Sequence, residues 1–248
     1  MKKLFIGFIV VVILAGFVLP AFAEYKVVLD VTDWKSETSL GYTRATGNTQ
    51  NTQLLGSFEA ERKTDKDQLT VKANTLYSSQ NKKMDGQKHN GSIRYGFDFW
   101  SDQWYGFMKF EAEHDKFANI DYRLLPSAGA GYWFSDTEEW KALAELGLGL
   151  EHTEYSNGAK ESTDVVLIPR AFAEKKVFTD STLSQEVIFY PNLDEGDQYR
   201  MRAETRFTNP LSEEMSLRCS FIDEYNSDPA GDSKKNDTRL VTSLVYSF

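Results

Sequence analysis

The sequence predicts an all-β fold: an antiparallel transmembrane β-barrel of about twelve strands, with ten or fourteen strands as alternatives. Three observations predict it. The chain ends on an alternating strand that stops at Phe248, similar strands follow one another from Trp34 onward, and short and long connections alternate between them. Bacterial outer-membrane barrels combine these features, with short turns on the periplasmic side and longer loops on the extracellular side.

The last ten residues show the pattern clearly. One face of this strand is mostly apolar and consists of Leu240, Thr242, Leu244, Tyr246 and Phe248. The opposite face is mixed and consists of Arg239, Val241, Ser243, Val245 and Ser247. An outward apolar face and a terminal interfacial aromatic are typical of a strand that closes a membrane barrel. We therefore interpret Tyr246 and Phe248 as an assembly signal, although this strand alone fits an ordinary soluble strand equally well.

The first 23 residues predict a cleaved signal peptide. A basic start precedes an apolar run over residues 4–19, and Ala21 and Ala23 occupy the small positions that signal peptidase reads. Cleavage before Glu24 leaves a short periplasmic segment, residues 24–33, ahead of a barrel domain over residues 34–248. The alternative is an uncleaved anchor, for which the run is short.

Composition narrows the classes of function. A formal net charge of −9 argues against nucleic acid as a partner, and the single cysteine, Cys219, cannot form an internal disulfide. No second apolar run reaches the length of a spanning helix, which excludes a helical membrane protein. A barrel is not excluded, because its apolar residues alternate with polar ones.

Each predicted strand has a set of alternate, mostly apolar residues that we assign to the outside of the barrel. In the first half these sets run Thr38 to Tyr42, Leu54 to Ala60, Leu69 to Tyr77, Ile93 to Phe99, Met108 to Ala112 and Leu124 to Phe134. In the second half they run Ala142 to Leu150, Val165 to Ala173, Leu183 to Phe189, Tyr199 to Phe207, Met215 to Phe221 and Leu240 to Phe248. Pro126 and Pro169 fall on strands, where each removes a backbone donor and predicts a bulge.

The connections and the aromatic residues divide between two ends of the strands. Short turns are expected near residues 64–65, 101–102, 135–138, 179–180 and 209–210, and longer loops over 79–90, 155–162, 191–197 and 226–237. Aromatic residues at the short-turn ends are Trp34, Phe99, Trp100, Trp104, Tyr105, Trp133, Phe134, Trp140, Phe178, Phe207 and Phe248. Those at the long-loop ends are Tyr77, Phe117, Tyr155, Tyr190 and Tyr225. Two aromatic girdles favour a membrane barrel over a soluble sandwich or lipocalin-like barrel, which would hold its aromatics inside.

Three stretches resemble one protein family. They are Trp34 with Leu40-Gly41-Tyr42 and Thr46-Gly47-Asn48-Thr49, the central segment from Asp115 to Tyr132, and the ending from Asp237 to Phe248. On these short motifs the chain resembles a domain-of-unknown-function family described as salt-induced outer-membrane proteins. The resemblance implies a bacterial outer-membrane barrel. It brings no catalytic residue, ligand or partner, and the salt-induced label describes expression rather than mechanism.

The inward sets carry charges of both signs, which an apolar core would not hold unpaired. The candidate lumen-lining residues are Arg94, Lys109, Arg123, Arg170, Arg200, Arg202, Arg206 and Arg218, with Glu111, Glu113, Glu145, Glu151, Glu174, Glu186 and Glu204. Twelve strands lie between barrels that side chains fill and wide porins. We therefore favour a structural barrel or a narrow, plugged pore closed by Arg–Glu pairs, with an open diffusion channel for small solutes or ions as the alternative.

The tenth predicted strand concentrates positive charge. Arg200, Arg202 and Arg206 share its inward face, and Arg218 on the next strand faces the same interior. Only Glu186 and Glu204 oppose them locally, so the sequence predicts a positive excess, which in a water-filled lumen favours anions.

A membrane-embedded hydrolase is a further, weaker hypothesis. His152 and Ser156 lie close in sequence, but four strand residues separate their Cα atoms by roughly 13 Å, beyond the hydrogen bond that a nucleophile and its base require. The acidic loops at 194–197 and 228–237 lack the spacing of an EF-hand. We expect no catalytic residue, metal or cofactor.

The predicted location is the outer membrane of a Gram-negative bacterium. The expected partners are outer-membrane lipid and, during biogenesis, the outer-membrane assembly machinery and periplasmic chaperones.

Overall fold

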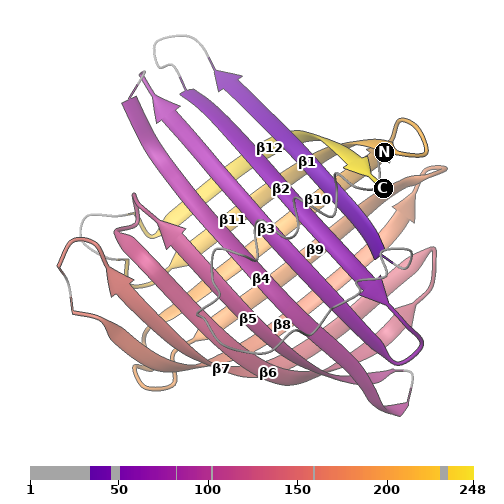
Figure 1. Ribbon diagram of the computed structural model, residues 1–248, viewed down its shortest axis with the longest axis horizontal. Coiled ribbons are helices and arrows are strands. Elements are labelled where there is room, and N and C mark those ends of the chain that lie inside the picture. The colour runs from indigo at the N-terminus through magenta and orange to yellow at the C-terminus, as the bar shows by residue number, and fades with distance from the viewer. Residues whose placement is uncertain (1–33, 46–50, 82, 102, 159, 230–233) are drawn as a thin grey trace, which may run out of the picture. The chain divides into compact units, whose positions relative to one another are not determined.

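The computed structural model describes residues 34–45, 51–81, 83–101, 103–158, 160–229 and 234–248. Twelve antiparallel strands close a barrel in the order β1-β12-β11-β10-β9-β8-β7-β6-β5-β4-β3-β2 (Figure 1). They are β1 (Trp34–Ala45), β2 (Asn51–Lys63), β3 (Asp67–Gln80), β4 (Lys83–Ser101), β5 (Trp104–Asp115), β6 (Ile120–Asp136), β7 (Trp140–Tyr155), β8 (Ser162–Val177), β9 (Ser181–Pro191), β10 (Tyr199–Pro210), β11 (Met215–Asn226) and β12 (Asn236–Ser247). The predicted antiparallel barrel of about twelve strands is confirmed. The expected signal peptide and the segment 24–33 lie outside the described residues.

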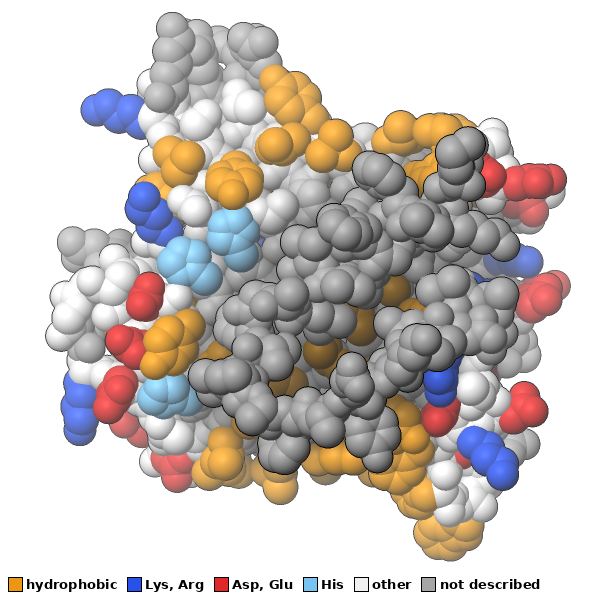
Figure 2. Space-filling model, in the orientation of Figure 1, with side chains coloured by type: hydrophobic (Ala, Val, Ile, Leu, Met, Phe, Trp, Pro, Cys, Tyr) orange, Lys and Arg blue, Asp and Glu red, His pale blue; other side chains and the backbone are white. Residues whose placement is uncertain are grey.

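Alternation along the strands separates the two surfaces of the barrel wall. Leu40 and Leu240 face outward and are 63% and 66% exposed, whereas Val245 on an inward position is 1% exposed. Figure 2 shows hydrophobic side chains along the upper and lower margins of the face in view. Among the described residues, no helix is both long and apolar enough to span a bilayer.

The connections differ between the two ends of the strands, mostly as predicted. At one end they cover residues 64–66, 102–103, 137–139, 178–180 and 211–214, and at the other end the longest cover 156–161, 192–198 and 227–235. The first short turn is held by Thr64, whose N–H donates to the Asp67 carbonyl at 2.8 Å and whose hydroxyl donates to the Asp67 carboxylate at 2.8 Å.

The expected loop over residues 79–90 is wrong. β3 continues to Gln80 and β4 begins at Lys83, and the two strands pair from Gln80↔Lys83 onward. Asn81 sits at the turn with φ of +50°, a left-handed conformation that asparagine tolerates well. The polar residues that suggested a loop therefore belong to an extended hairpin, with a register shift between Ser78 and Ser79.

The two bulges predicted at prolines are also wrong. Pro126 pairs with Phe110 on the β5 side, and the β6–β7 register is the same before it, at Leu124↔His152, and after it, at Ser127↔Gly149. Near Pro169, the pairing of β8 with β9 ends at Arg170↔Ile188. It resumes at the isolated bridge Val166↔Asn192, which keeps the same register. Each missing proline donor interrupts the ladder without shifting it.

Six of the aromatic residues assigned to the girdles line the internal cavity: Tyr105, Phe117, Trp133, Tyr155, Tyr190 and Tyr225. Tyr105 and Tyr190 are only 6% and 8% exposed. Exposed aromatics do occur near both ends, among them Trp100 and Phe178 at the short turns and Tyr42 at the other end. Position near a strand end does not tell an inward aromatic side chain from an outward one. That direction depends on whether the residue has an odd or an even place along its strand.

Candidate functional site

The candidate site is the interior of the barrel, a cavity of about 1080 Å³ lined by residues from all twelve strands. This volume is far above the roughly 10–15 Å³ that one buried water requires. Fourteen of the fifteen candidate lumen-lining residues are part of this lining: Arg94, Lys109, Glu111, Glu113, Arg123, Glu145, Arg170, Glu174, Glu186, Arg200, Arg202, Glu204, Arg206 and Arg218. The fifteenth, Glu151, faces inward as part of the ion pairs described below.

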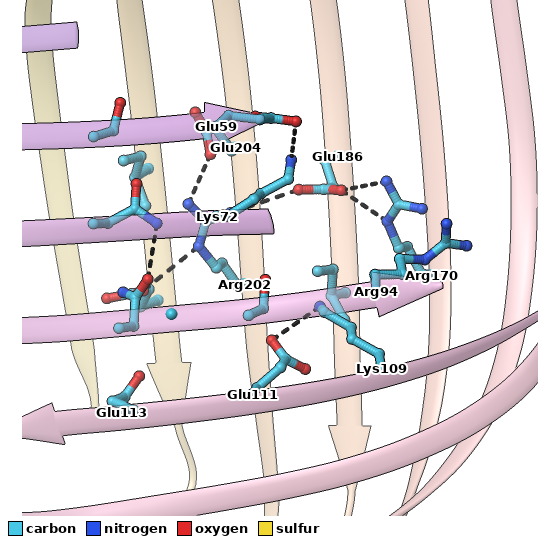
Figure 3. A pocket seen from close by; sticks show the side chains of 18 of the residues that line it. Glu59, Lys72, Arg94, Lys109, Glu111, Glu113, Arg170, Glu186, Arg202 and Glu204 are labelled. Atoms are coloured by element: carbon cyan, nitrogen blue, oxygen red, sulfur yellow. Dashed lines mark hydrogen bonds and ion pairs between the residues drawn. The ribbon is translucent and has the colours of Figure 1, made fainter. Parts of the chain in front are cut away.

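A first group of ion pairs links side chains of β4, β7, β8 and β9 inside the barrel. Glu145 on β7 accepts from Arg94 on β4 at 2.7 Å and from Arg170 on β8 at 2.9 Å. Arg170 also reaches Glu186 on β9 at 2.6 Å, an arrangement that Figure 3 shows from close by. The Tyr105 hydroxyl donates to the same Glu145 oxygen at 2.6 Å. Glu145 therefore has three donors, which is how a buried carboxylate is stabilised.

Small residues allow aromatic rings to lie flat against the barrel wall. A Cβ atom on Gly131 would lie 2.3 Å from the Tyr105 ring, and one on Gly129 would lie 2.7 Å from the Phe107 ring. Arg94 then stacks over the Phe107 ring at 4.8 Å. The glycines of β6 thus place the rings, and the rings help to place the guanidinium beside Glu145.

Arg202 on β10 continues the ion pairs across the neighbouring strands β9 and β11. It lies 2.7 Å from Glu204 on its own strand, 3.7 Å from Glu186 and 3.6 Å from Glu224 on β11. Arg206 pairs with the other oxygen of Glu204 at 2.9 Å. Arg202 therefore joins three carboxylates from three strands.

The ion pairs continue toward the long-loop end. Lys88 on β4 lies 3.2 Å from Glu113, 3.9 Å from Asp115 and 3.4 Å from Glu224. Arg123 lies 3.0 Å from Glu113 and 3.3 Å from Glu151. Two further pairs, Arg200–Glu151 and Arg239–Glu224, complete the set.

These contacts form one connected set of residues, which we call the lumen network. Its basic members are Lys88, Arg94, Arg123, Arg170, Arg200, Arg202, Arg206 and Arg239. Its acidic members are Glu113, Asp115, Glu145, Glu151, Glu186, Glu204 and Glu224. Eight basic groups and seven acidic groups nearly cancel, and most are less than one quarter exposed.

The predicted positive excess around β10 is wrong for a geometric reason. Arg200 is neutralised by Glu151, which lies three strands away around the barrel, and Arg202 by Glu224 as well as its near neighbours. Arg218 makes two hydrogen bonds to Glu37 on β1, at 2.7 and 2.9 Å. Parity along each strand predicted which side chains point inward, but the curvature of the wall decides which of them meet.

Some interior residues escaped the sequence analysis. Glu224, Lys88 and Glu37 follow the same inward parity as the residues that were proposed, so extending each strand by a few positions would have found them. Arg239 was placed on the mixed face of the last strand but was not proposed to line the lumen. The interior also holds an apolar cluster, made of Leu125, Val166, Ile168, Ile188 and Tyr190. Here β6, β8 and β9 are apolar on both faces, and alternation carries no signal where both faces are apolar.

The hydrolase constellation does not form. His152 lies beside Tyr122 at 5.9 Å between ring centroids, and its Nδ1 contacts the Thr163 hydroxyl at 2.8 Å. The Ser156 N–H instead donates to the Asn119 carbonyl. His89 and His114 stack on each other at 6.1 Å, and Figure 2 shows the histidines gathered on one side of the face in view. The described residues contain no group of three or more His, Cys, Asp or Glu side chains able to hold a metal ion.

Two solved structures of outer-membrane channels and porins share the closed-barrel fold of this chain. The outer-membrane channel COG4313 from Pseudomonas putida F1 superposes with a TM-score of 0.54 at 12% identity, over 94% of this chain and 100% of that chain. The NanC porin superposes with a TM-score of 0.51 at 12% identity, over 86% of this chain and 98% of that chain.

The model of DUF481, a family of proteins of unknown function, matches residues 38–248, so the chain belongs to this family. No curated protein matches the sequence.

Proposed function

We propose that this protein spans the outer membrane of a Gram-negative bacterium as a narrow channel whose lumen is constricted by the lumen network. The observation that carries the proposal is the pair formed by Lys88 and Glu224, which reaches across the cavity between β4 and β11. The surrounding interior is polar and large enough for water. A narrow lumen with fixed charges of both signs conducts small ions weakly and excludes larger solutes.

Single-channel recording on the refolded protein in planar bilayers tests this proposal. We expect a small, steady conductance with little preference for anions or cations, because the lumen network is nearly neutral. Lys88→Ala removes the connection across the cavity and should raise the conductance. Lys141→Ala is the matched control, since Lys141 pairs with Glu174 on the neighbouring strand at 3.2 Å and does not cross the lumen.

Two other results would assign a different role. A large conductance from the unmodified protein would indicate an open diffusion channel. A bilayer that stays silent with both the unmodified protein and Lys88→Ala would indicate a structural barrel.

The proposed role is not enzymatic. We also propose a route by which the protein reaches the outer membrane. We propose cleavage of the signal peptide before Glu24, escort by periplasmic chaperones, and insertion by the outer-membrane assembly machinery, which would recognise Tyr246 and Phe248. Outer-membrane lipid would cover the outward face. The resemblance to salt-induced outer-membrane proteins adds a separate proposal, that expression rises with external salt, which a transcript measurement at two salt concentrations tests.

A further inference from the structure

The lumen network is confined to one part of the barrel wall. Among the described residues all of its members lie on β4 to β12, and none lies on β1, β2 or β3. These three strands are neighbours and form one continuous sector between β12 and β4. Two ion pairs reach this sector from elsewhere: Arg218–Glu37 at its edge and Lys63–Asp136 at the short-turn end. Between them, the interior beside β2 and β3 is not braced by the network.

The exposure of inward side chains follows the same division. On β7, all six inward positions over residues 143–153 are buried. On β2, all six inward positions over residues 53–63 keep part of their surface exposed. On β3, five of the six inward positions over residues 68–78 do so, and Thr70 is the exception. The free space of the cavity of about 1080 Å³ therefore lies mainly against β2 and β3.

Short polar side chains account for this difference. The inward residues of β2 and β3, and of the adjoining part of β4, carry many hydroxyl and carboxamide groups: Gln53, Ser57, Asn74, Ser78, Asn90 and Ser92. Leu55 and Leu76 are the apolar residues among the inward positions of β2 and β3. The apolar cluster on β6, β8 and β9 is close-packed instead, and Ile168 and Ile188 within it are 8% and 7% exposed. Short side chains leave more of the interior to water.

One ion pair lies within this sector. Lys72 Nζ on β3 lies 2.8 Å from Glu59 on β2, and Figure 3 shows both side chains inside the pocket. The side chains of Lys72 and Glu59 are 45% and 28% exposed, whereas that of Glu145 in the lumen network is 4% exposed. A solute can therefore reach Lys72 and Glu59 more easily than Glu145. Because their signs are opposite, they add no net charge to the sector.

We infer that solutes cross the barrel along β2 and β3, and that this path favours small uncharged polyols over ions. We call the path the polar lane, and its residues are Gln53, Ser57, Glu59, Lys72, Asn74 and Ser78. Hydroxyl and carboxamide groups both donate and accept hydrogen bonds, so they can replace the water around a polyol. An ion loses hydration in a narrow lane and finds no net charge there to offset the loss. The inference rests on the proposed function, because it names the path and the solute class of the same channel.

A path along β7 to β9 would require larger changes. Glu145 is held there by three donors, and Ile168 and Ile188 are packed in the apolar cluster. A solute on that route would have to break buried ion pairs and displace close-packed side chains. Beside β2 and β3 it displaces water.

Thiol accessibility locates the polar lane without requiring transport. Ser57→Cys and Ser184→Cys, each in a Cys219→Ser background, place the same side chain on β2 and on β9. Ser184 lines the cavity but is 7% exposed. In protein refolded into vesicles, a methanethiosulfonate with a quaternary ammonium group should modify Ser57→Cys about tenfold faster, because thiol reactivity follows exposure. Heat-dependent migration on a detergent gel first shows that each variant is inserted.

Polyol entry tests the solute class. Vesicles that contain the protein should swell faster in ribitol than in potassium chloride, and should exclude the trisaccharide raffinose. Ser57→Trp fills the lane and should slow ribitol entry severalfold, and Gln53→Trp, at another level of the lane, replaces it if that variant fails to insert. Ala128→Trp is the control, since Ala128 is exposed on the outer surface between Met108 and Leu148 and its variant should admit ribitol normally.

Three results would overturn the inference. The first is modification of Ser184→Cys as fast as that of Ser57→Cys, and the second is equal ribitol entry through Ser57→Trp and Ala128→Trp. The third is a channel that conducts ions but does not admit ribitol, which would leave the proposed function standing. A protein that admits neither ions nor ribitol would contradict the proposed function as well, so the two failures are distinguishable.

Discussion

Lys88 and Glu224 face each other across the barrel, with 3.4 Å between Nζ and Oε2. β3, β2, β1 and β12 lie between their strands by the shorter route around the wall. No pattern within one strand or one hairpin could bring these two residues together. Their contact shows that the lumen network braces opposite walls and does not only follow each wall.

Arg202→Gln is expected to lower stability and to alter any ion selectivity. The change leaves Glu186, Glu204 and Glu224 with one basic partner fewer, so the free energy of unfolding should fall by about 2 kcal/mol. Urea unfolding in lipid vesicles measures this value. If the lumen conducts, the reversal potential should shift toward cations.

Arg62→Gln is the control for that variant, because Arg62 pairs with Asp67 at a more exposed turn and lies 3.3 Å from it. Its loss should cost about 0.5 kcal/mol or less. Equal losses in the two variants would show that the lumen network is no stronger than a surface pair.

Gly131→Ala is expected to destabilise the barrel by about 1–3 kcal/mol, because the new methyl group overlaps the Tyr105 ring. The same change in a Tyr105→Ala background should cost much less, and a double-mutant cycle in urea measures the coupling. Gly196→Ala is the control, since no atom lies within 4 Å of its added Cβ. A cost that is the same in both backgrounds would contradict the contact.

Phe248→Asp is expected to reduce insertion into the outer membrane. The Phe248 N–H donates to the Ser36 carbonyl at 2.9 Å, and its ring stacks on Tyr246 at 5.7 Å, so the residue both closes the wall and anchors it. Heat-modifiable protein in outer-membrane fractions gives the measurement. Phe178→Asp, at an exposed turn, should insert normally, and equal insertion of both variants would refute the role of the C-terminal residue.

Ala23→Arg is expected to block removal of the signal peptide, because a large charged residue does not fit the small position before the cleavage site. Intact-mass measurement should find Glu24 at the start of the unmodified protein and Met1 retained in the variant. Retention of Met1 in both would remove the prediction of cleavage.

The sequence predicted the barrel and the inward parity because both depend on the two-residue period of a strand. Leu240 and Val245 show this, since their exposure follows alternation alone. The hairpin around Asn81 was missed because its polar residues resemble a loop when no partner strand is considered. The pairing of Arg200 with Glu151 was missed because it depends on the curvature of the whole wall.

Among the described residues the ladder between β1 and β12 runs from Glu37↔Ser247 to Gly41↔Ser243, and its shortness bears on the order in which the molecule folds. All other neighbouring strands are joined by hairpins, so their contacts are close in sequence, whereas Glu37 and Ser247 lie at opposite ends of the barrel domain. Long-range contacts require the greatest loss of chain entropy, and here only a short ladder offsets it. We expect closure to be the last step of folding, and the amides of residues 37–41 and 243–247 to exchange with solvent hydrogen before those of β6 and β7.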